Sequence, residues 1–292
     1  MRGLRARRRI RISSPTVRTP LEAAVTILMM GAVPVIIRHI SANVWTIGLA
    51  RLGVAAAGMA LAVWLMRRWV TPTLREARQL ALIGVLFGAH WALYFLSIKV
   101  SSAGIAVIGQ STFGVHLVVL GWVIGHHRVA RSDLAAVACA VAGSLMVAPR
   151  WSLRDHDTLG LLLGIVSAFF YAFLPILHQR LSHLSSGMRV LGQFVFGLLV
   201  FLPAWPASDW HLTGGDWFWL MVLAVVCTLV QHTLWTRLTT RLPTLTTSVL
   251  FYLAVPVTLA LGVTLLGERL TWWMLAGAAL IVSGNLVALS GR

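Results

Sequence analysis

Ten stretches of about twenty weakly charged residues follow one another along this 292-residue chain. The hydrocarbon core of a bilayer is about 30 Å thick, and an α-helix crosses it with about 20 apolar residues. We therefore expect each stretch to form one membrane-spanning helix. The predicted helices cover residues 21–40, 45–66, 79–98, 104–124, 132–149, 159–178, 189–206, 217–236, 245–266 and 271–290.

The composition supports a membrane protein, since 58% of the residues are hydrophobic, only 11% are charged, and the mean hydropathy is +0.84. A soluble domain has far fewer apolar residues. The apolar runs are continuous and lack the sustained two-residue alternation of a transmembrane β-barrel. The expected fold class is all-α: a polytopic membrane protein with ten transmembrane helices.

The formal net charge of +16 is distributed unevenly. If the N-terminus is cytoplasmic, eighteen Lys and Arg residues fall on cytoplasmic segments and five on the other side, which predicts that both termini are cytoplasmic. The basic tail, residues 1–20, is interpreted as a topology determinant beside anionic lipid rather than as a nucleic-acid-binding segment. The preference for Arg over Lys suggests a GC-rich bacterial genome, and hence the bacterial cytoplasmic membrane.

The second half of the chain is a weak copy of the first, displaced by 142 residues. This shift aligns Gly125 with Gly267 and, inside two predicted helices, His90 with His232. Five helices per half is an odd number, so the two halves must enter the membrane from opposite sides, as in many secondary transporters. A duplicated scaffold without transport is the alternative. The predicted units are the tail (1–20), a first repeat (21–149) and a second repeat (159–290).

Several motifs resemble the EamA-type branch of the drug/metabolite transporter superfamily: "GERL" at 267–270, "AGAALIVSGNLVAL" at 276–289, "SSAG" at 101–104 and "AR" at 50–51. The resemblance implies a ten-helix bundle whose central cavity is lined mainly by helices 1 to 4 and 6 to 9. It also implies export of amino acids or other small metabolites or drugs from the cytoplasm by alternating access, without a cofactor. A non-transporting membrane scaffold and an intramembrane enzyme are the alternatives.

The first repeat departs from the family pattern at two places. His126 and His127 stand where the family usually has a Glu after Gly125, and Gly114 replaces the proline expected in helix 4. The second repeat keeps both features, as Glu268 and Pro256.

Polar and aromatic groups inside the predicted helices are the candidates for substrate binding, because polar groups in a membrane span are costly. His90, Trp91 and Tyr94 recur on one face of helix 3, where ring faces would bind apolar surface and the polar tips would orient a solute. Packing of the helices explains the same stripe equally well. The full candidate set is Arg51, His90, Trp91, Tyr94, Gln110, Gln231, His232, Trp235 and Tyr252.

Arg51 has two possible roles. It stands about one and a half turns inside helix 2, from where a long side chain can reach the headgroups or point inward at an anionic solute.

The eight acidic residues all fall at helix ends or in loops, so no carboxylate is expected near the midplane. If protons drive transport, the candidate carriers are His90, His116 and His232, because histidine titrates near neutral pH. We therefore expect uniport or a weakly histidine-coupled antiport.

Prolines within predicted helices 1, 6 and 9 remove backbone hydrogen bonds in mid-span and make local bending easier, although static kinks are an equal alternative. The hinge candidates are Pro34, Pro175 and Pro256. Neither a metal site nor a disulfide is expected, since Cys139 and Cys227 fall at unrelated positions in predicted helices.

Overall fold

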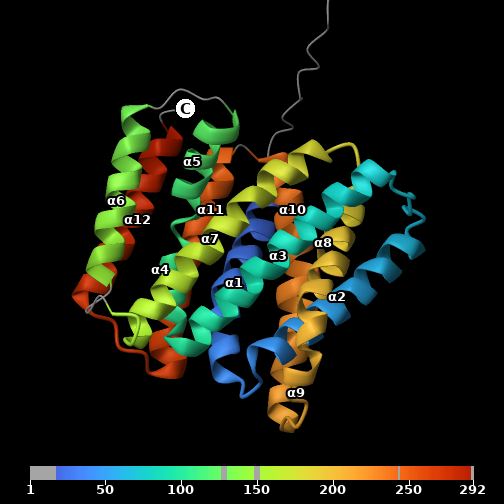
Figure 1. The fold of residues 1–292 in the computed structure, drawn as a ribbon, viewed down its shortest axis with the longest axis horizontal. Coiled ribbons are helices and arrows are strands. Elements are labelled where there is room, and N and C mark those ends of the chain that lie inside the picture. Colours follow the sequence, from blue (N-terminus) through green and yellow to red (C-terminus); the bar gives the residue numbers. More distant parts are fainter. Residues whose placement is uncertain (1–17, 126–129, 148–151, 243, 291–292) are drawn as a thin grey trace, which may run out of the picture.

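The computed structural model describes residues 18–125, 130–147, 152–242 and 244–290, and within these ranges the secondary structure is entirely helical (Figure 1). The basic tail up to residue 17, and His126 with His127, lie outside the described residues. The helices are α1 (Arg18–His39), α2 (Val44–Leu65), α3 (Leu74–Val100), α4 (Ala103–Gln110), α5 (Phe113–Gly125), α6 (Arg131–Val147), α7 (His156–Arg180), α8 (Ser186–Phe201), η1 (Leu202–Ala207), α9 (Gly214–Met221), η2 (Val222–Val230), α10 (Gln231–Arg241), α11 (Thr244–Leu266) and α12 (Trp272–Ser290).

The all-helical membrane fold predicted from the sequence is confirmed. Eight helical segments of the described chain are long and apolar enough to cross a bilayer, and they coincide with predicted helices 1 to 4 and 6 to 9. Predicted helix 10 appears as a shorter apolar segment, Trp272–Val287, and predicted helix 5 corresponds to the 17-residue α6. The number of ten crossings therefore stays a prediction.

Predicted helix 4 is interrupted near its middle, between α4 and α5. Ser111 donates its hydroxyl proton to the carbonyl of Ile108 at 2.6 Å, and Thr112 donates to the carbonyl of Gly109 at 2.8 Å. Such side-chain bonds to nearby carbonyls compete with the regular helical pattern. A hydropathy profile does not detect this break, because it averages Gln110, Ser111 and Thr112 with the apolar residues on both sides.

Predicted helix 8 is continuous in path but changes its winding. It begins as α9, continues as the π-helical η2 and ends as α10. The hydroxyl of Thr228 donates to the carbonyl of Leu223, five residues earlier, at 2.7 Å. π-helical turns inside α-helices are rare, and those that do occur are often found at functional sites.

The packing of the helices follows the internal repeat. The corresponding helices α6 and α12 pack against each other at one side of the bundle, and α2 packs against α8 at the other (Figure 1). Between these pairs, α3 contacts both α7 and α8, while α1 lies against α11 and α4 lies against α7. The middle of the bundle is thus built from elements of both repeats.

Two glycines allow α4 to approach α7 closely. A Cβ atom on Gly109 would lie 2.9 Å from the carbonyl oxygen of Leu161, and one on Gly164 would lie 3.2 Å from the carbonyl oxygen of Ala106. The two backbones therefore touch here. This contact brings Gln110 of α4 next to Ser167 of α7.

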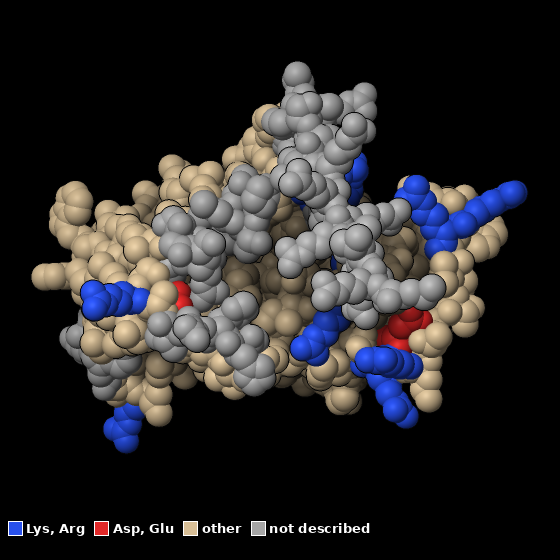
Figure 2. All heavy atoms as spheres, turned by 90° about the horizontal axis from the view of Figure 1, so that it is seen from above, with Lys and Arg blue, Asp and Glu red and all other residues tan. Residues whose placement is uncertain are grey.

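Basic side chains gather at one end of the bundle. Figure 2 looks onto the end at which α7 finishes and α8 starts, and it shows Lys and Arg side chains around the rim with few acidic ones. Because consecutive membrane helices run in opposite directions, every second connection lies on this side. The described basic residues at these helix ends are Arg67, Arg68, Arg75, Arg78, Arg131, Arg180, Arg237 and Arg241. This is the end that the charge distribution predicts to be cytoplasmic.

Candidate functional site: a central cavity between the repeats

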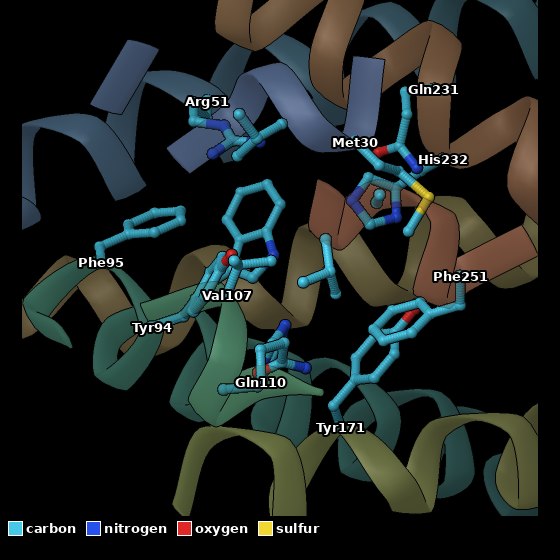
Figure 3. Close-up of a pocket in the computed structure, with 15 residues that line it drawn as sticks. Met30, Arg51, Tyr94, Phe95, Val107, Gln110, Tyr171, Gln231, His232 and Phe251 are labelled. Atoms are coloured by element: carbon cyan, nitrogen blue, oxygen red, sulfur yellow. The ribbon is translucent and has the colours of Figure 1, made fainter. Parts of the chain in front are cut away.

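A cavity of ≈ 80 Å³ lies in the middle of the bundle, between helices of both repeats (Figure 3). Its walls come from α1 to α4, α7, α10 and α11. The lining residues are Met30, Val33, Arg51, His90, Trp91, Tyr94, Phe95, Val107, Gln110, Tyr171, Gln231, His232, Phe251, Ala254 and Val255.

Seven of the nine predicted substrate-binding residues line this cavity: Arg51, His90, Trp91, Tyr94, Gln110, Gln231 and His232. The structure places the other two elsewhere. Trp235 borders a second cavity, and Tyr252 lies at a groove between α11 and α12.

Arg51 is directed inward rather than toward the headgroups, and only 1% of the residue is exposed. Its Nε donates a hydrogen bond to the hydroxyl of Thr228 at 3.0 Å, and its Nη2 donates to the carbonyl oxygen of Cys227 at 3.4 Å. The guanidinium carbon lies 4.1 Å from the ring centre of Trp91 and 5.1 Å from that of Phe95. These rings stabilise the cation through their electron-rich faces.

One nitrogen of this guanidinium, Nη1, is buried without a hydrogen-bond partner. In the described part of the chain no carboxylate pairs with Arg51. A buried charge is costly unless it is paired and hydrogen-bonded. The cavity wall therefore offers an unsatisfied cationic donor, which fits an anionic group of a solute.

His90 and Gln110 are joined through a serine of the opposite repeat. The His90 Nδ1 lies 2.7 Å from the hydroxyl oxygen of Ser167, which in turn lies 3.2 Å from Oε1 of Gln110. The His90 ring is also 4.7 Å from the ring of Tyr171. This cluster ties α3, α4 and α7 together, and Figure 3 shows two of its members, Gln110 and Tyr171, across the cavity from Arg51.

His232 faces the cavity from the second repeat and is surrounded by rings. Its ring centre lies 5.3 Å from that of Phe87, 5.7 Å from that of Trp91 and 5.8 Å from that of Phe194. The repeat-related histidines predicted from the sequence thus both reach the same cavity, where aromatic faces supply apolar surface.

His116, the third candidate proton carrier, does not line the central cavity. Its Nε2 lies 3.3 Å from the hydroxyl of Thr112 on its own helix, and its ring packs edge-on against Phe169 at 5.7 Å. These contacts suit a packing role between α5 and α7.

Tyr252 packs against the first repeat rather than the cavity. A Cβ atom on Gly114 would lie 2.1 Å from the Tyr252 hydroxyl oxygen and 2.5 Å from Oδ1 of Asn285. The space beside Gly114 is therefore filled by these two side chains. This explains the absence of a larger residue at the position where the family usually has proline.

The three predicted hinge prolines lie inside α1, α7 and α11, and each of these helices continues through its proline. Pro34 is buried, Pro175 is partly buried, and Pro256 is exposed on the outer face of α11. Their role as hinges stays a prediction.

The sequence prediction did not include Tyr171 and Phe251, which line the cavity, or Ser167, which bonds to His90 and Gln110. The other lining residues that it left out are apolar: Met30, Val33, Phe95, Val107, Ala254 and Val255. Tyr171 stacks on Phe251 at 5.8 Å between ring centres, and together they close the cavity opposite Arg51. The signal for Tyr171 was present, since it is one of only three tyrosines and stands in a predicted helix. Phe251 and Ser167 carry no comparable signal.

The described residues contain no group of three or more His, Cys, Asp or Glu side chains placed to hold a metal ion. Both cysteines are free thiols in the structure.

Comparison with known proteins gives one family match that covers both halves. The model of the EamA-like transporter family matches residues 21–148 and 158–290. A probable amino-acid metabolite efflux pump of Salmonella typhimurium is 28% identical over 222 residues, which cover 71% of this chain and 74% of the pump. A protein of the same description from Escherichia coli is 26% identical, over 70% of this chain and 73% of its own length.

The fold is also similar to a solved structure. One crystal structure superposes with a TM-score of 0.65 at 18% identity and covers 94% of this chain and 99% of its own. At this identity the likeness shows the fold alone.

Proposed function

Because the chain belongs to the EamA-like transporter family, we propose that it exports small metabolites that carry a carboxylate, amino acids among them, from the cytoplasm by alternating access. The family predicted from the motifs is confirmed, and with it a multi-pass membrane transporter rather than an enzyme. The substrate class, the direction and the mechanism are the proposal.

The observation that carries the substrate class is the buried, unpartnered Nη1 of Arg51 at the cavity wall. A carboxylate accepts short, charge-assisted hydrogen bonds from a guanidinium, and these are about twice as strong as bonds between neutral groups. A carboxylate in the cavity would therefore supply the partner that the protein itself does not.

The remaining walls suit the rest of an amphipathic solute. Trp91, Phe95 and Phe251 offer ring faces for an apolar side chain, while Gln110 and Gln231 offer amide groups that can orient it. The names of the two bacterial relatives, which are described as probable amino-acid metabolite efflux pumps, agree with this class.

Alternating access is supported by the size of the cavity. Pockets that bind small molecules have volumes of about 300 Å³ or more, whereas this cavity measures ≈ 80 Å³. The bundle must therefore open before a metabolite enters. In our proposal the two repeats are inverted, the chain crosses a bacterial cytoplasmic membrane ten times, and both termini are cytoplasmic.

The test is transport by purified protein in proteoliposomes. A panel of the common L-amino acids is compared with the corresponding amino-acid amides, which lack the carboxylate, for the wild type, Arg51→Gln and Arg51→Lys. We expect Arg51→Gln to lower uptake of the acids by about tenfold or more, since a charge-assisted bond is lost. Uptake of the amides should change little, and Arg51→Lys should be intermediate.

Arg131→Gln is the matched control, because Arg131 is exposed at the start of α6 and far from the cavity. Equal loss for acids and amides would show that Arg51 acts in folding and would reject the carboxylate assignment. Absence of flux for every solute, in correctly inserted protein, would favour the scaffold alternative.

Energy coupling is tested in the same vesicles. We expect uniport, or antiport weakly coupled through His232 or His90, which both face the cavity. Imposing a pH gradient on wild type and on a variant that lacks His90, His116 and His232 distinguishes the two. A gradient effect that persists in this triple variant rules the histidines out as carriers.

A further inference from the structure

A second cavity, of ≈ 90 Å³, lies beside the central one, between α7, α8 and α10. Tyr171 and His232 line both cavities, so the two spaces adjoin. The second cavity extends to Gln179 near the end of α7 and to Thr239 near the end of α10. It therefore lies between the central site and the end of the bundle that is rich in Arg.

The wall of this second cavity contains an arginine that the proposed transport step does not use. Arg189 of α8 is only 4% exposed, and its Nε is buried without a partner. Its Nη1 donates to the backbone carbonyl of His178 at 2.9 Å, which fixes the guanidinium at the end of α7. The Nε–H is left as a free donor that carries positive charge.

A complementary acceptor belongs to His178, which lines the same cavity. The Nε2 of His178 lies 2.7 Å from Oε1 of Gln193, a carbonyl-type oxygen that only accepts, so Nε2 carries the proton. In the neutral ring the other nitrogen, Nδ1, then has a free lone pair. This Nδ1 is also buried without a partner.

One of the two unsatisfied atoms is a hydrogen-bond donor and the other is an acceptor, so a ligand that satisfies both must carry an acceptor and a donor. Arg189 Nε donates and suits a carboxylate, whereas His178 Nδ1 accepts and suits an ammonium group. The head group of an α-amino acid carries both groups on a single carbon atom, Cα. A simple anion would satisfy only Arg189, and a simple amine would satisfy only His178.

We propose that the second cavity is an entry subsite for the zwitterionic head group of α-amino acids. Arg189 binds the carboxylate and His178 Nδ1 accepts a hydrogen bond from the ammonium group. The solute then passes Tyr171 and His232 to reach Arg51 in the central cavity. This inference rests on the proposed function and narrows its substrate class.

The experiment uses L-leucine as substrate in proteoliposomes. We expect Arg189→Gln and His178→Leu each to raise the apparent KM for leucine about tenfold, the effect of losing one charge-assisted bond, with kcat within about twofold. Arg78→Gln is the matched control, since Arg78 is exposed on the first turns of α3. It should match the wild type.

Two fragments of leucine separate binding from structural damage. One is 4-methylpentanoate, which lacks the ammonium group, and the other is isopentylamine, which lacks the carboxylate. We expect Arg189→Gln to lose inhibition by 4-methylpentanoate but keep inhibition by isopentylamine, and His178→Leu to show the reverse. A merely misfolded variant would lose both, and unfolding temperatures of each variant check this directly.

The possible failures are distinguishable. If the wild type carries leucine while Arg189→Gln and His178→Leu behave like Arg78→Gln, the second cavity holds only water and the inference is wrong, although the proposed function stands. If the wild type does not carry leucine, the inference fails together with the amino-acid part of the proposed function.

Discussion

His183 Nε2 lies 2.5 Å from a carboxylate oxygen of Glu76, and this contact joins the turn between α7 and α8 to the start of α3. A counterpart occurs 142 residues earlier than His183, at Ser41, in the turn between α1 and α2. Ser41 donates its backbone N–H and its hydroxyl to Asp216 at the start of α9, at 2.8 and 2.7 Å. The two turns lie at opposite ends of the bundle (Figure 1).

Both acids also close a capping box at the start of their helix. Glu76 binds Thr73, and Asp216 binds Thr213. Each carboxylate thus caps the start of one helix and holds a turn of the other repeat at the same time. We call these two contacts the end contacts.

The first prediction concerns the end contacts. Glu76→Gln should weaken the bond to His183 and the capping box, so backbone amides of the α7–α8 turn should exchange with deuterium about threefold to tenfold faster. Amides of the α1–α2 turn should not change. Exchange followed by mass spectrometry measures both regions in one sample.

Asp216→Asn is the internal control for that experiment. It should accelerate exchange at the α1–α2 turn and leave the α7–α8 turn unchanged. Uniform acceleration at both ends in either variant would mean that the contacts contribute to global stability and do not act separately.

The second prediction concerns the contact between Gly114 and Tyr252. Gly114→Ala places a methyl group where the Tyr252 hydroxyl and Asn285 now lie, and overpacking of this kind costs about 1–3 kcal/mol. Adding Tyr252→Phe should recover part of the loss, because it removes the nearer atom. The unfolding temperature in detergent measures both effects.

Gly53→Ala serves as the control for that substitution, because a Cβ atom on Gly53 meets nothing within 4 Å. It should leave the unfolding temperature unchanged or raise it slightly, since alanine favours the helix by about 0.5–1 kcal/mol. Destabilisation by Gly53→Ala equal to that by Gly114→Ala would contradict the packing explanation.

The third prediction concerns Ser167. Ser167→Ala removes the hydroxyl shared by His90 and Gln110. Nδ1 of His90 keeps the backbone carbonyl of Ser167 at 3.2 Å, but the buried Oε1 of Gln110 loses this donor, at a cost of about 1–3 kcal/mol. Chemical denaturation measures this loss. Thr264→Ala, which removes an exposed hydroxyl bonded within its own helix, should change stability by less than about 0.5 kcal/mol.

The fourth prediction concerns Glu268, which joins the second repeat to the start of α4. Its carboxylate accepts hydrogen bonds from the backbone N–H groups of Ala103 at 2.7 Å and Gly104 at 3.0 Å. Glu268→Ala should cost about 2 kcal/mol and Glu268→Gln about 1 kcal/mol, because glutamine keeps one acceptor. Thermal unfolding should therefore rank the wild type as most stable, Glu268→Gln next and Glu268→Ala last.

Arg269→Gln, at the exposed neighbouring position, is the control and should behave like the wild type. If Glu268→Ala did so as well, water would be replacing the carboxylate at the helix end. The "GERL" motif would then need another explanation.

Much of the fold could be predicted from hydropathy, because burial in lipid demands long apolar helices whatever their neighbours are. The pairing of His90 with His232 at one cavity could also be predicted, since a repeat places equivalent residues at equivalent depth. These arguments use the sequence one helix at a time or compare the two halves.

Three other features depend on contacts between helices. Tyr252 shares a polar tip and mid-span position with Tyr94, yet it faces Gly114, and only the rotation of α11 decides this. The sequence does not distinguish Arg189 from the other basic residues near helix ends, because its burial depends on the packing of α7 and α10 around it. The break at Ser111 depends on side-chain hydrogen bonds that a hydropathy window averages away.

The π-helical segment Val222–Val230 has a consequence for how a bound solute can act at a distance. Arg51 donates hydrogen bonds to two groups of this segment, the carbonyl oxygen of Cys227 and the hydroxyl of Thr228. A carboxylate that draws the guanidinium away removes them, and a return to regular α-helix shifts every following residue by one position, about 100° around the axis and about 1.5 Å along it. Binding of the solute and the return of this segment to α-helix are then linked equilibria, in which each favours the other.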